Sequence, residues 1–509
     1  MKEIIFYGDD AFFYDFPKDI DIYYGKDSLP PLDNEEAAIE SAIKNPIKSP
    51  KLKNLINANS TISICFDDIS VPLPPMKTDV RPIAAKIVLK YIKDIGIKDE
   101  NINFICATGL HRKCTPKELK HLLGKRIYKK YKDQIFNHDA EDKPNLKILG
   151  KTPEGDAIEI NKIAAESDLI IYLNISFTPL NGGWKSIIVG LGSYNTIIPH
   201  HSPEKLMKAS FMDPPSSELH NIIWEMGNII KDKLNIFTIE MVLNNNFYSG
   251  FYKKIYKQIK GTQEKIPLWR KLMLSLFRAF PKFLKSYVRK NLKASYQLID
   301  VFAGDIEEAH KKSLELMNKQ LNVEVPKKYD VIIFGVPNLT PYNVGSEMNP
   351  LLLHTLVSGY LFNMYQGEPP LKEKGSLIIV NPAYEVFDSQ QHPSYEDFYY
   401  NIMTQNPDIF DLKKIENEYL HNQEYIEKYR NDYAYHPTHA PIVYYWGVRG
   451  LLNVGKIIVA GAKNKDVIDV LGYEYAKNLD EAIERAKKIH SNECSIAYFC
   501  IPPLFVAKK

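Results

Sequence analysis

The chain has 509 residues, of which 45% are hydrophobic and 25% are charged, and its formal net charge is +3. A chain of this length exceeds what one hydrophobic core usually supports, so we expect two or three globular domains. The near-neutral balance of charge excludes a strongly basic, nucleic-acid-binding protein.

Apolar stretches and cysteines indicate whether the chain is secreted, crosses a membrane or carries disulfides. Asp9 and Asp10 stand where a signal peptide needs an apolar stretch, and the most apolar stretch, 440–462, carries Arg449 and Lys456. We therefore expect neither secretion nor a membrane span. The five cysteines are odd in number and match no zinc or disulfide spacing, which fits a reducing cytoplasm.

Several short apolar runs end in polar, turn-forming residues, and helical patterns such as 81–95 and 479–489 lie between them. This alternation predicts βαβ units: an α/β fold of two domains with mainly parallel sheets. Ligands bind beyond the carboxyl ends of such strands. The segments expected there are Asp67-Asp68, Thr108 to His111, Asn174 to Lys185 and Gly335 to Asn343.

A basic segment interrupts this rhythm. Residues 253–293 contain thirteen Lys and Arg against one acid, Glu264. Apolar residues recur at helical spacing on either side of Pro281, which predicts two basic amphipathic helices. They either pack on their own protein, with the acidic residues 385–433 as an internal partner, or contact an anionic membrane surface or an acidic partner.

Three short motifs carry residues with chemistry. Lys185 follows Gly182-Gly183-Trp184; a P-loop is rejected, because Trp184 separates glycine from lysine. A lysine can carry a covalent adduct, although a solvated loop lysine is the alternative. His111 follows a strand-like run and could exchange a proton, or simply pack in its loop. His201 stands sixteen residues after Lys185 and could bind a metal.

Other motifs are weaker. Residues Asp67 to Pro74 form a strand-to-loop transition, and the carboxylates of Asp67 and Asp68 could orient a ligand or cap a helix. His436 and His439 are three residues apart, but Pro437 argues against a helical metal face, so this segment is predicted to be a loop. No Gly-x-Gly-x-x-Gly follows a strand, which leaves a Rossmann dinucleotide site unsupported.

Taken in order, these segments resemble the nickel-pincer lactate racemase family. The resemblance covers most of residues 55–243 and 296–330 and, weakly, the C-terminal part, and the basic segment falls in its gap. The segments that carry it include Asp68 to Pro74, Ala107 to Arg112, Ile160 to Leu169, Gly182 to Ser186, Tyr194 to Ile197, His201-Ser202, Phe302 to His310 and Asn478 to Ala482.

The resemblance implies a nickel-pincer nucleotide cofactor, Ni(II) pyridinium-3,5-bisthiocarboxylic acid mononucleotide, in a cleft between two α/β domains. It implies that Lys185 anchors this cofactor covalently and that His201 is the nickel ligand. It further implies that Asp68, Ser70 and Val71 contact the cofactor, and that His111 is one of two histidines that exchange the hydroxyl proton while hydride passes to the cofactor and back.

The chain departs from the family pattern at the substrate site. The second histidine is replaced by Ile175, an expected arginine by Val71, and the substrate-binding Gln and Lys by Val344 and Glu347. A lactate carboxylate would then lack its cationic partners. Asn174, Tyr172 and Trp184 are candidate contributors to the site in their place.

We expect a racemase or epimerase of a 2-hydroxy acid that works with cofactor-biosynthesis enzymes. The alternative is a non-catalytic or repurposed ligand-binding protein on the same scaffold. The predicted domains are an N-terminal α/β domain at 1–245, the basic helical insertion at 246–296, and a C-terminal α/β domain at 297–509 whose last segment packs back on the first.

Overall fold

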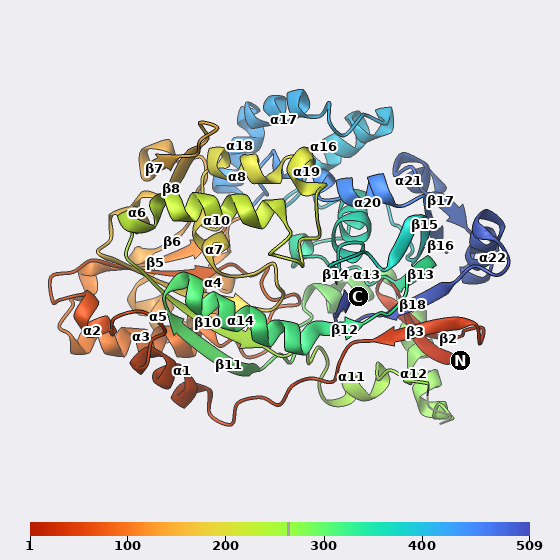
Figure 1. Cartoon of the computed structure of the whole chain (residues 1–509), viewed down its shortest axis with the longest axis horizontal. Coiled ribbons are helices and arrows are strands. Elements are labelled where there is room, and N and C mark those ends of the chain that lie inside the picture. Colours follow the sequence, from red (N-terminus) through yellow and green to blue (C-terminus); the bar gives the residue numbers. More distant parts are fainter. Residues whose placement is uncertain (262–264) are drawn as a thin grey trace.

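The computed structural model describes residues 1–261 and 265–509, so Glu264 lies outside the described residues. The described chain forms two six-stranded sheets with helices packed around them, side by side along the long axis of the molecule (Figure 1). This confirms the predicted fold class of two α/β domains with mainly parallel sheets.

The first sheet has the strand order β11-β10-β9-β4-β5-β6. All neighbours are parallel except β11, which returns antiparallel to β10. Its central strands are apolar on both faces because helices cover both, as in other buried parallel sheets. The strands are β4 (Ile62–Asp67), β5 (Ile102–Ala107), β6 (Ile135–Asn137), β9 (Leu169–Ser176), β10 (Ile236–Leu243) and β11 (Leu298–Gly304).

The second sheet has the order β17-β16-β15-β13-β18-β3 and is parallel throughout. Its edge strand β3 comes from the N-terminus and pairs with β18 near the C-terminus, with Tyr23 opposite Phe499. The strands are β3 (Ile20–Tyr24), β13 (Tyr329–Gly335), β15 (Leu371–Val380), β16 (Lys456–Ala460), β17 (Glu474–Ala476) and β18 (Ile496–Cys500).

The predicted domain boundaries therefore need correction. The first 24 residues, with hairpin β1 (Lys2–Tyr7) and β2 (Asp10–Asp15), belong to the second domain, because β3 completes its sheet. The boundary at 297 falls too early, since β11 and helix α14 (Ile306–Leu321) pack on β10 of the first sheet. Near the C-terminus, Leu504 packs against the core of the first domain.

The basic insertion folds as α11 (Gly250–Ile255), α12 (Leu268–Ala279) and α13 (Lys282–Lys290). It leaves the first sheet between β10 and β11 but packs on the second domain, with α12 beside β2 (Figure 1). Among the described residues, its ion-pair partners are Asp9, Asp10, Asp27 and Glu347. The alternative that residues 385–433 neutralise it internally is therefore wrong.

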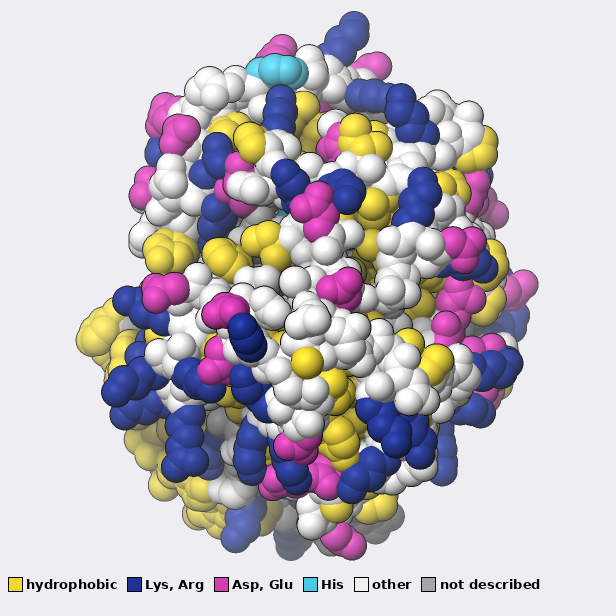
Figure 2. All heavy atoms as spheres, turned by 90° about the vertical axis from the view of Figure 1, so that its left-hand side faces the viewer, with side chains coloured by type: hydrophobic (Ala, Val, Ile, Leu, Met, Phe, Trp, Pro, Cys, Tyr) yellow, Lys and Arg dark blue, Asp and Glu magenta, His cyan; other side chains and the backbone are white. Residues whose placement is uncertain are grey.

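The cysteines and the helices are both the subject of predictions from the sequence. Cys65, Cys106 and Cys500 are buried, and all five cysteines are free thiols. Within 1–261 and 265–509, no helix has both the length and the apolar character needed to cross a bilayer. Figure 2 shows the face at the left of Figure 1, where Lys and Arg are more frequent on the lower half and hydrophobic side chains gather at the lower left.

Candidate functional site

A cavity of about 250 Å³ lies between the two domains. In the first domain it begins where β4, β5 and β9 end, at Asp67, Ala107 and Asn174. In the second it begins after β13 and β18, at Val336 and Ile501. The carboxyl ends of two parallel sheets thus face each other across it, and each of the four predicted segments contributes to its wall.

Glu240 and His310 pack against the glycine pair that precedes Trp184 and Lys185. Gly182 and Gly183 have positive φ, 97° and 59°, a backbone region that favours glycine. The N–H of Gly183 donates to the buried carboxylate of Glu240 over 3.0 Å, and a Cβ on Gly183 would meet His310 at 2.6 Å. Glu240 therefore fixes the turn that starts helix α7 (Trp184–Ile188).

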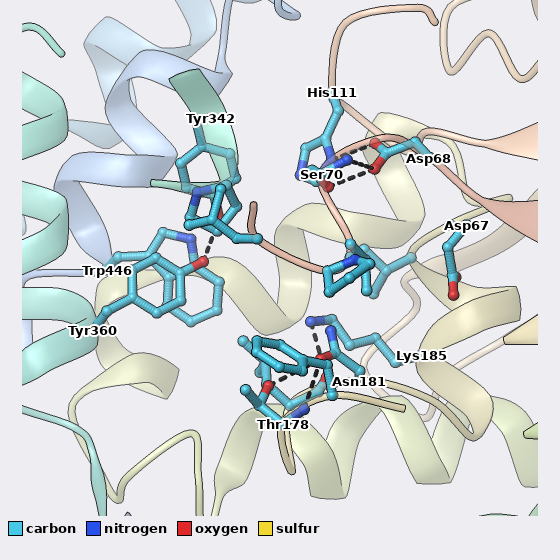
Figure 3. A pocket seen from close by; sticks show the side chains of 18 of the residues that line it. Asp67, Asp68, Ser70, His111, Thr178, Asn181, Lys185, Tyr342, Tyr360 and Trp446 are labelled. Carbon is cyan, nitrogen blue, oxygen red and sulfur yellow. Dashed lines mark hydrogen bonds and ion pairs between the residues drawn. The ribbon is translucent and has the colours of Figure 1, made fainter. Parts of the chain in front are cut away.

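Trp184 lies beneath this turn and not in the cavity. Its indole N–H donates to Glu307 over 2.9 Å, and its ring covers Gly227 on helix α10 (Glu218–Ile230). With Trp184 held on that side, the next residue is directed to the other. The side chain of Lys185 points into the centre of the cavity (Figure 3).

Gly227→Ala is expected to loosen this arrangement. Ala normally stabilises a helix interior by about 1 kcal/mol relative to Gly. Here the added Cβ would lie 2.2 Å from the ring of Trp184, and overpacking of this kind costs about 1–3 kcal/mol. We expect the thermal midpoint to fall, whereas Glu225→Ala, at an exposed position on the same helix, should leave it nearly unchanged. An unchanged or raised midpoint for Gly227→Ala would contradict this packing.

Lys185 is a buried amine with an altered acidity. Burial lowers its pKa to about 8, against an opposing effect of nearby Asp67. Its Nζ donates to the carbonyl of Leu180 over 3.1 Å. A larger fraction of the amine is therefore neutral near pH 7 than for an ordinary lysine, and only the neutral amine is a nucleophile.

His201 ends helix α8 (Tyr194–His201) and lines the same cavity. Its Nδ1 lies 3.0 Å from the carbonyl of Ile197, which can only accept, so Nδ1 carries the proton. Burial lowers the pKa of His201 to about 3, so the ring is neutral. Its Nε2 lone pair is then available, as a metal-binding histidine requires.

His111 is oriented by a carboxylate. Its Nδ1 lies 2.8 Å from Oδ2 of Asp68, whose Oδ1 accepts from the backbone N–H of Ser70 over 2.8 Å and from the Ser70 hydroxyl. Burial alone would raise the pKa of Asp68, but His111 and Ser70 hold it below its ordinary value. The proton therefore stays on Nδ1 of His111, which leaves Nε2 able to accept one. Val71 continues this wall of the cavity.

The neighbouring carboxyl, Asp67, is in a different state. Burial raises its pKa to about 7, although it accepts from the Tyr172 hydroxyl and from the N–H of Ile175. Arg81, fully buried at the start of helix α3 (Arg81–Asp94), donates to the main-chain carbonyls of both Asp67 and Asp68. Arg81 thus fixes the strand end that presents both carboxyls.

The second domain supplies the opposite wall. Figure 3 shows Tyr342, Tyr360 and Trp446 together on this side, facing His111 and Lys185. Tyr360 comes from the π-helical segment Thr355–Leu361, and Trp446 directly follows helix α19 (His439–Tyr445). The wall is aromatic, and the hydroxyls of Tyr342 and Tyr360 are 2.7 Å apart and hydrogen-bond each other.

His439 is the residue that the sequence pattern missed. The prediction of a loop is wrong at this position, because His439 begins α19 and lines the cavity. Its ring centroid lies 5.4 Å from that of His111, and its Nδ1 lies 2.5 Å from the hydroxyl of Tyr395. Its spacing from His436 carried no signal, since His436 instead bonds Thr438 and Glu141.

Three residues that depart from the family pattern, Ile175, Val344 and Glu347, do not line the cavity. Ile175 is buried in β9. Glu347 instead pairs with Arg289 and Lys290 of the insertion. The basic or titratable nitrogens on the described cavity wall belong to Lys185, His111, His201 and His439. Within the described residues, no three or more His, Cys, Asp or Glu cluster so as to hold a metal by themselves.

The fold and the cavity define a two-domain α/β protein whose ligand site lies between the carboxyl ends of two parallel sheets. Residues 7–212 match the lactate racemase N-terminal domain. The lactate racemase of Thermoanaerobacterium thermosaccharolyticum is 24% identical over 467 residues, which cover 91% of this chain and 88% of that protein. The lactate racemase of Lactiplantibacillus plantarum is 25% identical over 461 residues, 89% and 86% of the two chains.

The solved structure of the lactate racemase apoprotein from Thermoanaerobacterium thermosaccharolyticum has the same fold. It covers 100% of both chains with a TM-score of 0.63 at 21% identity. These matches confirm the resemblance to the lactate racemase family, through its N-terminal domain model and through two lactate racemases aligned over about nine-tenths of the chain.

Proposed function

We propose that this enzyme racemises or epimerises a 2-hydroxy acid with a nickel-pincer nucleotide covalently bound to Lys185. The observation that carries the proposal is that Lys185 and His201 present a partly neutral amine and a free imidazole lone pair to one cavity. An amine suits a covalent anchor, and nitrogen together with sulfur and carbon donors suits square-planar nickel(II).

The residues present fit this group. His201 supplies one nitrogen ligand, and the cofactor would supply the others. Asp68, Ser70 and Val71 line the wall beside Lys185 and are positioned to contact the nucleotide. When bound, the cofactor supplies a carbon that accepts and returns hydride at the substrate α-carbon.

His111 is proposed to take the proton of the substrate hydroxyl. Its Nε2 can accept a proton because Asp68 holds the other proton at Nδ1, and the carboxylate stabilises the imidazolium that forms. The same orientation returns the proton on the reverse step. Asp68 is thereby both a part of the cofactor wall and the partner that positions His111.

His439 is proposed to take the place of the missing second histidine. It reaches the cavity from the second domain, within 5.4 Å of His111 by ring centroids. The Tyr395 hydroxyl can either donate to Nδ1 of His439 or accept from it, so both neutral forms of the ring are allowed. Nε2 can therefore either donate a proton to the substrate oxygen or accept one.

The substrate is proposed to carry a larger apolar group than lactate does. Tyr342, Tyr360 and Trp446 form the wall opposite Lys185, and apolar surface of this kind favours an apolar substituent. Val344 and Glu347, which stand at the family's substrate-binding Gln and Lys positions, do not line the cavity. A small substrate dominated by its carboxylate would therefore find no cation at those positions.

Intact-mass and nickel measurements test the anchor directly. Protein co-expressed with cofactor-biosynthesis enzymes should carry an adduct and bound nickel. Lys185→Ala should lose both, while Lys208→Ala, an exposed lysine after α8, should keep both. His201→Ala should keep the adduct but lose nickel, because it removes a ligand and not the anchor.

An unmodified Lys185 with no nickel in the co-expressed protein would overturn the proposal. The chain would then be a ligand-binding protein on the lactate racemase scaffold, the alternative left by the altered substrate positions. Turnover of a panel of 2-hydroxy acids that disappears in Lys185→Ala would exclude that alternative.

A further inference from the structure

The basic insertion has an unusual orientation of its two faces. On α12, Arg270 and Leu274 are buried, and Met273 and Phe277 are half-buried against the second domain. The outward side carries large apolar side chains one helical turn apart. These are Leu268, Leu272, Leu276 and Phe280, with Trp269 beside them.

The inner contacts of α13 are polar. Arg289 is buried and pairs with Asp9 over 2.8 Å and with Glu347 over 2.6 Å, and Lys285 pairs with Asp10 over 2.8 Å. Its outer side is again apolar, with Phe283 and Tyr287 exposed. Helix α13 is thus attached through cations and presents apolar residues to the outside, the reverse of an ordinary surface helix, whereas α12 is apolar on both its inner and its outer side.

These apolar side chains are highly exposed and protrude from the surface of the protein. Leu268 is 80% exposed and Phe283 is 76% exposed. Lys254, Lys271 and Arg278 are exposed around them, and the sequence from 253 to 293 holds one acid, Glu264. Protruding Trp, Phe and Leu among lysines and arginines are the features of helices that lie in the interface of a membrane.

We infer that the outer face of α12 and α13 binds an anionic membrane surface. The apolar side chains would enter the acyl boundary while the lysines and arginines meet lipid phosphates. A second copy of this chain is a poorer occupant, because it would bring the same excess of positive charge against itself.

Vesicle co-sedimentation of the full chain tests this inference. We expect binding to phosphatidylcholine vesicles that contain phosphatidylglycerol, little binding to phosphatidylcholine alone, and release as salt rises. Leu272→Ser with Phe283→Ser should weaken binding at least tenfold. Ile148→Ser with Trp224→Ser removes exposed apolar side chains elsewhere and should have no effect.

The charge contribution has its own pair of variants. Lys254→Gln with Lys271→Gln should weaken binding to anionic vesicles several-fold, whereas Lys51→Gln with Lys53→Gln, exposed on the first domain, should not. The lysine and apolar variants should retain wild-type thermal midpoints, because these side chains make no buried contact.

Three results would overturn the inference. One is no binding to anionic vesicles at low salt. Another is a dimer in solution that Leu272→Ser with Phe283→Ser dissociates, which would assign the face to a second copy. The third is equal binding to soluble polyglutamate that the apolar variants do not weaken, which would indicate an acidic protein partner.

Discussion

His439→Phe is expected to lower kcat by about 10² to 10⁴-fold, the usual contribution of a positioned acid or base. The phenyl ring keeps the aromatic contacts of His439 with Tyr342 and Tyr435 but removes both ring nitrogens. The Lys185 adduct and bound nickel should remain, because His439 is proposed to handle a substrate proton and not to hold the cofactor. The measurement is turnover of 2-hydroxy acids by a chiral assay, alongside intact mass.

Two further variants separate a chemical role from a structural one. Tyr395→Phe keeps the ring of His439 in place but removes its hydrogen-bonding partner, and it should give a smaller loss in kcat with little change in KM. His121→Phe, at a histidine outside the cavity, should leave kcat unchanged. Full activity in His439→Phe with the adduct intact would show that His439 is only part of the wall.

Arg81→Met is expected to destabilise the first domain by about 3–5 kcal/mol, the cost of leaving one partner of a buried ion pair alone. Arg81 and Asp79 are 0% and 1% exposed and lie 2.6 Å apart. The variant also removes the donors to the carbonyls of Asp67 and Asp68. The midpoint of urea unfolding, followed by circular dichroism, measures the effect.

A surface pair on the same helix provides the control. Lys86→Met breaks the ion pair between Lys86 and Glu36, whose side chains are 69% and 52% exposed. The variant should lower the free energy of unfolding by about 1 kcal/mol or less. Adding Asp79→Leu to Arg81→Met should recover part of the loss, because it removes the unpaired buried charge. A loss no larger for Arg81→Met than for Lys86→Met would contradict the role of this pair.

The local parts of the fold could be predicted from the sequence. The runs ending at Phe66, Ala107, Leu173, Phe334, Val380 and Ala460 all lie in strands, since an apolar run followed by turn residues is a local property. The same reasoning placed Asp68, His111 and Lys185 near one site, because parallel strands end at a common edge. Their roles in catalysis and cofactor binding stay predictions.

What the sequence did not reveal depends on long-range contacts. Nothing near Ile20 indicates that β3 pairs with β18, which lies at the far end of the chain. His439 reaches the cavity only because the second domain places α19 opposite His111. The insertion has apolar residues on both sides of α12, so its periodicity could not indicate which side faces the protein.

The pairing of β3 with β18 sets an order of events during synthesis. The first sheet is complete once β11, ending at Gly304, has left the ribosome, so that domain can fold while the rest is translated. Residues 1–24 are made first but must wait for Ile496–Cys500 before their sheet can close. The second domain therefore needs both the first and the last residues to be synthesised, and a chain truncated before residue 496 would leave β3 without its partner strand.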